Sequence, residues 1–308
     1  MKAIKTIFIG TPDFAIPSLK VLIADSDFAV VGVITKPDKP VGRKQIITPP
    51  PIKALALEHG LLVFQPEKIK EFVNEIKNLS PDLIVITAYS QIIPQSILDI
   101  PQYGCINVHG SLLPKYRGAS CIQAAILNGD QETGVTIMKI DAGLDTGAIL
   151  SQAKLAIEST WTGGDLYEKI AELGASILAD TLKKYVNGEI VPVAQNDSAA
   201  SYAGILKKED GLIDWAWEAV RVERFVRAMQ PWPGTFANFD GMRIKIIEVS
   251  GEILSLNDGE IVKLFVHNSN LSVQCGKDTL TIKRLQLEGK KIMNSQEFLN
   301  GHSRAVAK

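Results

Sequence analysis

An asparagine and a histidine stand two residues apart at the end of an apolar stretch, residues 105–110. An extended chain points alternate side chains to the same face, so Asn107 and His109 share one face of a predicted strand. The amide can donate a hydrogen bond to a carbonyl oxygen that becomes negatively charged. The imidazole can move a proton near neutral pH or stabilise the same charge. The pair is therefore a candidate catalytic pair, although a histidine at a strand end more often has a structural role.

A carboxylate follows a second apolar stretch. Residues 134–140 predict another inner strand, and the loop after it reads DAGLDTG, residues 141–147. If the two strands are neighbours, Asp145 would come to the same sheet edge as His109, where it would fix the tautomer of the imidazole and favour its charged form. The alternative is that Asp145 only forms a turn. Asn107, His109 and Asp145 are therefore candidates for one catalytic set.

The elements that must position this set alternate between strand and helix patterns. Strands are predicted at residues 6–10, 29–35, 82–89, 105–110, 134–140 and 148–157, and helices at 12–24, 52–59, 69–79, 95–99 and 162–185. Continuous apolar strands between helices indicate a parallel sheet that is covered on both faces. The fold class predicted for this half is α/β, with an open, mostly parallel, Rossmann-like sheet that binds ligands at its carboxyl edge.

The last hundred residues have a different pattern. After a helical stretch at residues 215–229, short alternating runs between residues 234 and 287 are separated by turn signals such as Asp240-Gly241 and Asp258-Gly259. This predicts a small C-terminal β-barrel of the OB-like kind. We divide the chain into a catalytic domain at 1–189, a linker at 190–206 and the barrel domain at 207–308.

One long loop interrupts the first domain. Residues 36–53, KPDKPVGRKQIITPPPIK, hold five prolines and five cations, which excludes a helix or an inner strand. Long loops inside compact domains are usually functional or disordered. The loop is thus a candidate contact for a polyanion.

Composition limits the remaining possibilities. The formal net charge is -1, and residues 207–308 carry 15 Lys and Arg against 13 Asp and Glu. With so little excess positive charge, the protein could bind a polyanion only through a local cluster of basic side chains. The cysteines Cys105, Cys121 and Cys275 form neither a disulfide framework nor a zinc pattern, and we expect reduced thiols in a cytoplasmic protein. No apolar run approaches a membrane span.

Two stretches together resemble a known family. INVHGSLLPKYRG (106–118) and ETGVTIMKIDAGLDTG (132–147) resemble the formyltransferases that use 10-formyltetrahydrofolate, and GTPDFA (10–15), LKKEDGLIDW (206–215) and PWPGTF (231–236) extend the resemblance along the whole chain. The resemblance implies formyl transfer to an amine, with Asn107, His109 and Asp145 as catalytic residues and no metal. It also implies a folate site, which we assign to Ser111, Leu112, Leu113, Pro114, Tyr89, Ile92, Ile140, Asp141 and Gly143.

The proline-rich basic loop and the extra domain indicate which acceptor to expect. They are similar to those of family members that formylate the α-amino group of methionine on initiator tRNA for translation initiation, which implies a cytoplasmic monomer with that tRNA as its partner. The expected tRNA contacts are Arg43, Lys44, Lys207, Lys245, Lys283 and Lys290. Members that act on glycinamide ribonucleotide, on sugar nucleotides or on water stay as alternatives, as does a folate- or RNA-binding protein without catalysis.

Overall fold

The computed structural model describes residues 3–42, 44–239, 241–256 and 263–302. The chain folds into two compact units. The first comprises Met1–Gly118, Thr133–Ala156 and Tyr167–Ala203, and the second comprises Ala119–Glu132, Ile157–Leu166 and Gly204–Lys308. The domain boundaries predicted above stay predictions, but the part of the predicted linker up to Ala203 groups with the first unit.

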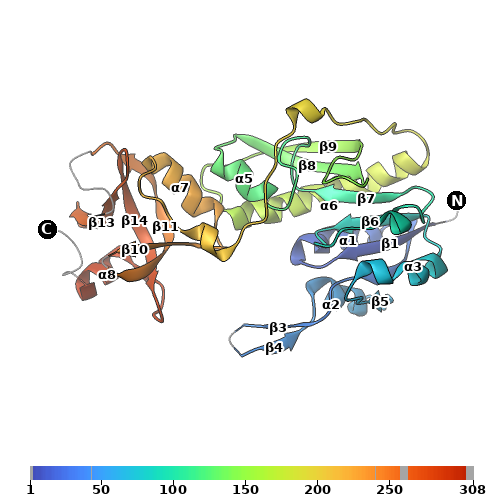
Figure 1. The fold of residues 1–308 in the computed structure, drawn as a ribbon, viewed down its shortest axis with the longest axis horizontal. Helices are drawn as coiled ribbons and strands as arrows, with labels where there is room; N and C mark the ends of the chain where they lie inside the picture. Colours follow the sequence, from blue (N-terminus) through green and yellow to red (C-terminus); the bar gives the residue numbers. More distant parts are fainter. Residues whose placement is uncertain (1–2, 43, 240, 257–262, 303–308) are drawn as a thin grey trace. The chain divides into compact units, whose positions relative to one another are not determined.

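A sheet in the order β5-β2-β1-β6-β7-β8-β9 forms the centre of the first unit. Its strands are β1 (Ile4–Gly10), β2 (Phe28–Ile34), β5 (Val63–Phe64), β6 (Leu83–Thr87), β7 (Cys105–His109), β8 (Glu132–Lys139) and β9 (Ile149–Ala156). The pairs from β5 to β7 are parallel, whereas β8 runs antiparallel to β7. Figure 1 shows β7, β8 and β9 in green beside the blue first strands.

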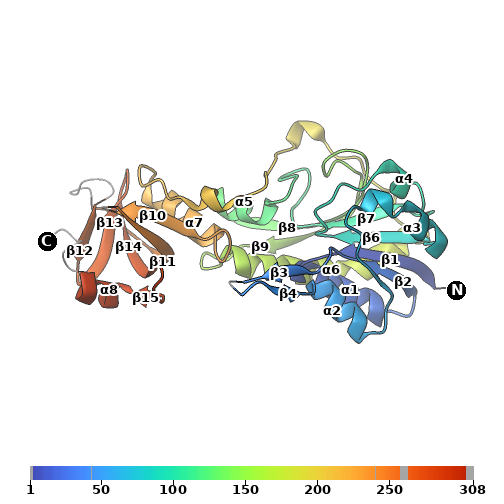
Figure 2. The same cartoon turned by 60° about the horizontal axis from the view of Figure 1, so that its bottom comes forward.

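Helices cover both faces of this sheet, as continuous apolar strands require. Phe8 packs with α1 (Ile16–Ala24), α2 (Pro51–Glu58) and α6 (Gly163–Val186), while Ile7 and Ile9 pack on the other face. That second face is covered by the 3-10 helix η2 (Ile69–Glu71) with α3 (Val73–Leu79) and α4 (Gln95–Leu98). Figure 2 shows α1, α2 and α6 below the sheet and α4 above it.

Two short strands of the proline-rich loop form a hairpin. β3 (Lys39–Val41) and β4 (Ile46–Thr48) pair antiparallel and project away from the sheet (Figure 1). Lys53 Nζ lies 2.7 Å from Asp38 Oδ2, and Gln65 Nε2 donates to Asp38 Oδ1 at 2.8 Å, so the base of the hairpin is tied down. The residues of this loop before α2 form neither a helix nor an inner strand, as predicted, and a two-stranded ribbon tolerates proline at its edges.

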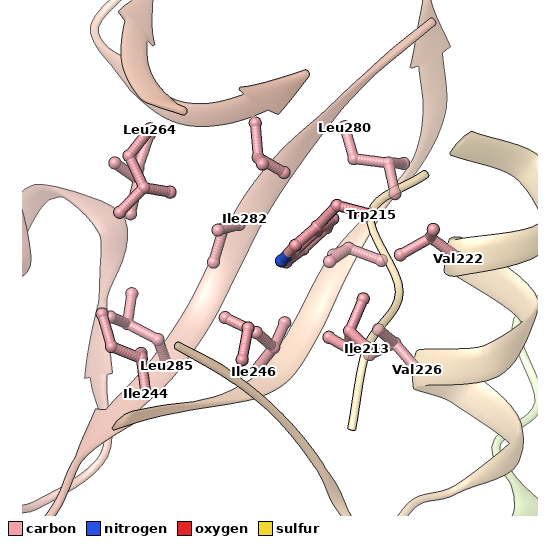
Figure 3. Close-up of a cluster of buried hydrophobic side chains, with 14 of the residues drawn as sticks. Ile213, Trp215, Val222, Val226, Ile244, Ile246, Leu264, Leu280, Ile282 and Leu285 are labelled. Carbon is pink, nitrogen blue, oxygen red and sulfur yellow. The ribbon is translucent and has the colours of Figure 1, made fainter. Parts of the chain in front are cut away.

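The second unit is built on an antiparallel sheet in the order β10-β11-β14-β13-β12, with β15 beside β14. Its elements are α5 (Cys121–Leu127), α7 (Ala219–Ala228), β10 (Thr235–Phe239), β11 (Met242–Leu254), β12 (Leu264–His267), β13 (Asn270–Gln274), β14 (Thr279–Leu287), β15 (Met293–Asn294) and α8 (Ser295–His302). Figure 3 shows Trp215 at the centre of its core, between Val222 of α7 and Ile282 of β14. Trp215 therefore packs in the core of the second unit.

The predicted fold class is confirmed: a mostly parallel α/β sheet precedes a small antiparallel β domain. Within the described residues, no helix is both long and apolar enough to cross a bilayer.

Candidate active site

The last strand of the parallel series, β7, carries the predicted Asn–His pair. It pairs with β6 on one side, Ile86 with Asn107, and with β8 on the other, His109 with Thr136. Ile106 and Val108 enter the core under α1, α2 and α6. Strand alternation therefore turns Asn107 and His109 to the opposite face, as the sequence predicted.

The carboxylate reaches this pair by another route than expected. A parallel neighbour would have ended at the same edge as β7, but β8 is antiparallel, and Lys139 at its end pairs with Ile106. The loop after β8 must therefore fold back along β7. Asp145 nevertheless comes to His109, with 3.6 Å between Asp145 Oδ2 and His109 Nδ1. The prediction that Asp145 lies beside His109 holds, while the reason given for it was wrong.

The histidine ring is held on both sides. His109 is 6% exposed, and its Nε2 lies 3.0 Å from the carbonyl oxygen of Tyr116. A carbonyl only accepts, so this contact requires the proton on Nε2 and turns Nδ1 toward Asp145. At 3.6 Å the Nδ1–Oδ2 contact is longer than a hydrogen bond but close enough for an ion pair when the imidazole is charged.

Backbone geometry fixes the aspartate. Asp145 has φ of 52°, in the left-handed region that non-glycine residues rarely occupy, and its Oδ2 accepts a hydrogen bond from the Gly118 N–H at 2.8 Å. Gly118 has φ of +106°, and a Cβ there would lie 2.5 Å from the Ala203 carbonyl oxygen. Strained conformations of this kind persist where the surrounding structure holds them and often mark functional sites.

The asparagine is available for a ligand. Asn107 is half-buried, and its side-chain amide makes no hydrogen bond to any other described residue. A half-buried amide without a protein partner is suited to donate to a substrate oxygen.

The Ser-Leu-Leu-Pro loop after β7 is packed against β8. Thr136 Oγ1 donates to the Ser111 carbonyl oxygen at 2.6 Å and accepts from the Leu113 N–H at 3.1 Å, and Ser111 Oγ donates to the Lys115 carbonyl oxygen at 2.6 Å. Ser111 and Leu113 are buried, Leu112 and Pro114 are half-buried, and the Leu113–Pro114 peptide is cis.

The other predicted folate residues differ in exposure. Tyr89 is 2% exposed in the core with η2, α3 and α4, where burial raises the pKa of its hydroxyl to about 12. Ile92, by contrast, is 92% exposed. Ile140 is half-buried, whereas Asp141 and Gly143 are exposed at the start of the Asp145 loop, where Asp141 Oδ1 accepts from Thr146 Oγ1 and the Gly143 N–H.

Sequence reasoning missed two side chains that hold these loops. Gln195 Nε2 donates to the carbonyl oxygens of Asp145 and Gly147, each at 2.8 Å, and Arg117 donates to Gln195 Oε1. Gln195 lies in the predicted linker. Arg117 belongs to the quoted stretch 106–118. Its place between Tyr116 and Gly118 was the sequence feature that could have identified it.

Two family models match the chain. One, described as "Formyl transferase", matches residues 4–182, and the other, "Formyl transferase, C-terminal domain", matches residues 205–303. The chain belongs to the formyl transferase family.

Relatives extend over nearly all of this formyl transferase. A protein of Citrifermentans bemidjiense named methionyl-tRNA formyltransferase is 45% identical over 304 residues, covering 98% of this chain and 95% of its own. One of the same name from Ruminiclostridium cellulolyticum is 46% identical, covering 97% and 96%.

Solved structures share the fold. An N-formyltransferase of Helicobacter canadensis in complex with folinic acid and dTDP-3-aminofucose has a TM-score of 0.69 at 21% identity, covering 91% of this chain and 98% of its own. The methionyl-tRNA formyltransferase of Clostridium thermocellum has a TM-score of 0.55 at 19% identity, covering 81% and 94%. At these identities the likeness establishes the fold alone.

The predicted tRNA contacts of this formyl transferase lie in both units. Arg43 lies outside the described residues, and Lys44 is exposed at the turn between β3 and β4. Lys53, also a cation of that loop, is paired with Asp38. Three apolar side chains of the hairpin are exposed by more than half: Val41, Ile46 and Ile47.

The second unit carries its predicted cations on exposed positions. Lys207 precedes the 3-10 helix Lys208–Gly211, Lys245 lies on β11, Lys283 on β14, and Lys290 follows β14; all four are exposed. Lys245 pairs with Gln286 of β14, and the guanidinium of Arg243 stacks on the Phe236 ring at 3.7 Å. Arg243 and Lys245 thus lie on β11 beside an aromatic ring, whereas Lys283 on β14 lies 3.9 Å from the Glu248 carboxylate.

The described part of the chain contains no group of three or more His, Cys, Asp or Glu placed to hold a metal ion.

Proposed function

We propose that this protein transfers the formyl group of 10-formyltetrahydrofolate to the α-amino group of methionine on initiator methionyl-tRNA. Near full-length relatives named methionyl-tRNA formyltransferase, at 45% identity, are the observation that carries the proposal. The juxtaposition of His109 and Asp145 beside Asn107 supports it independently, because acyl transfer to an amine needs an oxyanion stabiliser and a proton acceptor.

The reaction begins with attack of the amine nitrogen on the formyl carbon. The C=O bond opens into a tetrahedral intermediate whose oxygen carries negative charge. Asn107 has a side-chain amide that can donate to that oxygen. When His109 is protonated, its positive charge stabilises the same oxygen electrostatically, because its two ring nitrogens already face Tyr116 and Asp145. Donors fixed before the reaction stabilise the charge without reorganising.

Collapse of the intermediate breaks the bond between the formyl carbon and the folate nitrogen. The attacking nitrogen loses one proton, and the folate nitrogen gains one. Asp145 accepts the amine proton, directly or through water, while its charge keeps His109 oriented through the 3.6 Å Nδ1–Oδ2 contact. The overall balance needs no oxidant, metal or further reactant.

The donor is a folate carrying a formyl group, and we assign its site to the loops around the trio. The half-buried Leu112, Pro114 and Ile140 offer apolar surface for a flat heterocycle, and the exposed backbone at Asp141 and Gly143 offers hydrogen-bonding groups. The side chain of Tyr89 is buried, so in this proposal Tyr89 contributes to the folate site through its backbone.

In this proposal two groups of basic residues contact the acceptor tRNA. The hairpin supplies Arg43 and Lys44, and the sheet face of the second unit supplies Lys245, with Lys207, Lys283 and Lys290 as further phosphate contacts. Cations on backbone phosphates give affinity and register without reading sequence. We further propose a monomer in the cytoplasm, where charged initiator tRNA is used.

The test is a formylation assay with purified protein and 10-formyltetrahydrofolate. The expected result is formylation of methionyl initiator tRNA at least about a hundredfold faster than of methionyl elongator tRNA, a discrimination of about 2.7 kcal/mol. An amino sugar nucleotide, glycinamide ribonucleotide and water serve as competing acceptors. Preference for any of these three would refute the proposal and name the alternative.

A further inference from the structure

The segment that follows the last strand–helix pair is bound to the active-site loops. Residues 192–203, which we call the strap, exchange backbone hydrogen bonds with β9 through Val193 and Ile149 at 2.8 and 2.9 Å. Further along, the Ser201 carbonyl oxygen accepts from the Arg117 N–H, and the Ala203 N–H donates to the Arg117 carbonyl oxygen, both at 2.8 Å. The strap thus lies along the loop that carries Tyr116, whose carbonyl contacts His109.

One strap side chain reaches the aspartate loop. The Gln195 Nε2 amide donates to two carbonyl oxygens, those of Asp145 and Gly147, each at 2.8 Å. These two bonds lie on either side of Thr146 and hold the backbone on which Asp145 keeps its left-handed φ of 52°. The direct contact to the backbone of a predicted catalytic residue distinguishes Gln195 from the rest of the strap.

A buried arginine fixes the orientation of that amide. Gln195 Oε1 accepts from Arg117 Nε at 3.1 Å and from Arg117 Nη2 at 2.9 Å. A flipped amide would place its NH2 against the guanidinium and its oxygen against two carbonyl oxygens, so the hydrogen-bond network allows one orientation. The planar guanidinium matches this role, because its fork holds one acceptor with two donors.

Arg117 is itself immobilised. Its side chain is 2% exposed, and it also donates to Asp197 Oδ1 at 2.6 Å and to the Tyr202 hydroxyl at 3.3 Å. Its chain neighbours make the two key contacts of the site: the Tyr116 carbonyl meets His109 Nε2, and the Gly118 N–H meets Asp145 Oδ2. A single buried residue therefore connects both sides of the His109–Asp145 pair.

We propose that Gln195 and Arg117 are positioning residues that set the geometry of Asp145 against His109, rather than residues that hold the fold in general. The inference rests on the proposed function, because its kinetic test measures the formylation of methionyl-tRNA. Neither side chain touches the reacting atoms; both act through the backbone of Asp145 and Gly118. Small displacements of catalytic groups cost large factors in rate, which is why such support matters.

The first test compares Gln195→Leu with Asn196→Ala in steady-state formylation. Gln195→Leu keeps the approximate size and loses every hydrogen bond, so kcat should fall by about 10- to 100-fold while the KM for the folate donor changes by less than about threefold. Asn196 is the matched control, because among the described residues its side chain bonds to Ser198 of the strap and to no other residue. Asn196→Ala should stay within about twofold of wild type.

A double-mutant cycle separates positioning from general damage. If Gln195 acts through Asp145, Gln195→Leu should cost less than about twofold in an Asp145→Asn background, because the group it positions has already been disabled. An equal fall in kcat in both backgrounds would overturn the proposal. So would a fall caused by Asn196→Ala as large as that caused by Gln195→Leu.

A readout without catalysis keeps the inference distinct from the proposed function. The Gly118 N–H is bonded to Asp145 Oδ2, so its hydrogen exchange should become at least about tenfold faster in Gln195→Leu and stay unchanged in Asn196→Ala. If the wild-type protein does not formylate methionyl-tRNA but the two variants show this exchange pattern, the proposed function is refuted and the positioning role remains. Unchanged exchange at Gly118 in Gln195→Leu would refute the positioning role.

Discussion

Thr136 offers the sharpest test of how the loop after β7 is held. Its side chain is fully buried opposite His109, and its hydroxyl joins three groups: it donates to the Ser111 carbonyl oxygen, and it accepts from the Leu113 N–H and from Gln152 Nε2. Thr136→Val keeps the shape and removes all three bonds. Gln152 retains its bond to the Leu113 carbonyl oxygen, so two buried backbone groups lose this partner.

The magnitude follows from those two groups. A buried donor or acceptor left without a partner costs about 1–3 kcal/mol, so the two groups together should destabilise the first unit of Thr136→Val by about 2–6 kcal/mol. The KM for the folate donor should rise more than kcat falls, since the substitution loosens a loop assigned to folate and leaves the Gly118–Asp145 bond in place.

The assay is native-state hydrogen exchange at the β7–β8 amides, which reports the first unit alone. Thr133→Val is a matched control on the same strand, because the Thr133 hydroxyl is buried without a hydrogen-bond partner among the described residues. Thr133→Val should be neutral or slightly stabilising. A Thr136→Val effect below about 1 kcal/mol, or one equal to that of Thr133→Val, would refute the reasoning.

Three further outcomes are expected. His109→Ala should lower kcat by at least about a thousandfold and leave folate binding, measured by calorimetry, within about tenfold; loss of folding would instead make His109 structural. Arg43→Ala should raise the KM for tRNA and leave the KM for folate unchanged, and equal damage to both would exclude the hairpin as a tRNA contact. Hydrogen bonds from Lys53, and then from Gln65, lower the pKa of Asp38. Because the folded pKa lies below the unfolded value of about 3.9, this stabilisation is present above that pH and disappears as the pH falls through the folded pKa. Lys53→Met should therefore lower Tm at pH 7, with a difference from wild type that shrinks toward pH 3; a constant difference would contradict the assignment.

The face of a strand on which a side chain lies could be predicted from the sequence, because it depends only on local periodicity. Strand alternation placed Asn107 and His109 on one face without knowledge of any neighbour. The direction of β8 was not predictable in the same way, because a strand buried on both faces is apolar throughout whether it runs parallel or antiparallel. Because the direction of β8 was not predicted, the path by which the chain brings Asp145 to His109 was not predicted either.

Long-range support escaped prediction for a different reason. Residues 187–201 are small and polar, a composition typical of a linker, and nothing local in them indicates that Gln195 bonds to a loop 50 residues earlier. Arg117 was visible in the signature, but a buried arginine cannot be told from a surface one by spacing alone. Tyr89, assigned to the folate site by resemblance, has its side chain buried in the core, and its assignment to the folate site stays a prediction.

The strap changes where this molecule can be divided. The formyl transferase model ends at residue 182, and a fragment cut there would contain Asn107, His109 and Asp145 yet lack Gln195 and the carbonyl partner of the Arg117 N–H. For chimeras that exchange the C-terminal unit, Gly204 is the better joint, since it is exposed and a Cβ built there would meet nothing within 4 Å. An inactive shorter fragment would then indicate the loss of the strap rather than a requirement for the C-terminal unit.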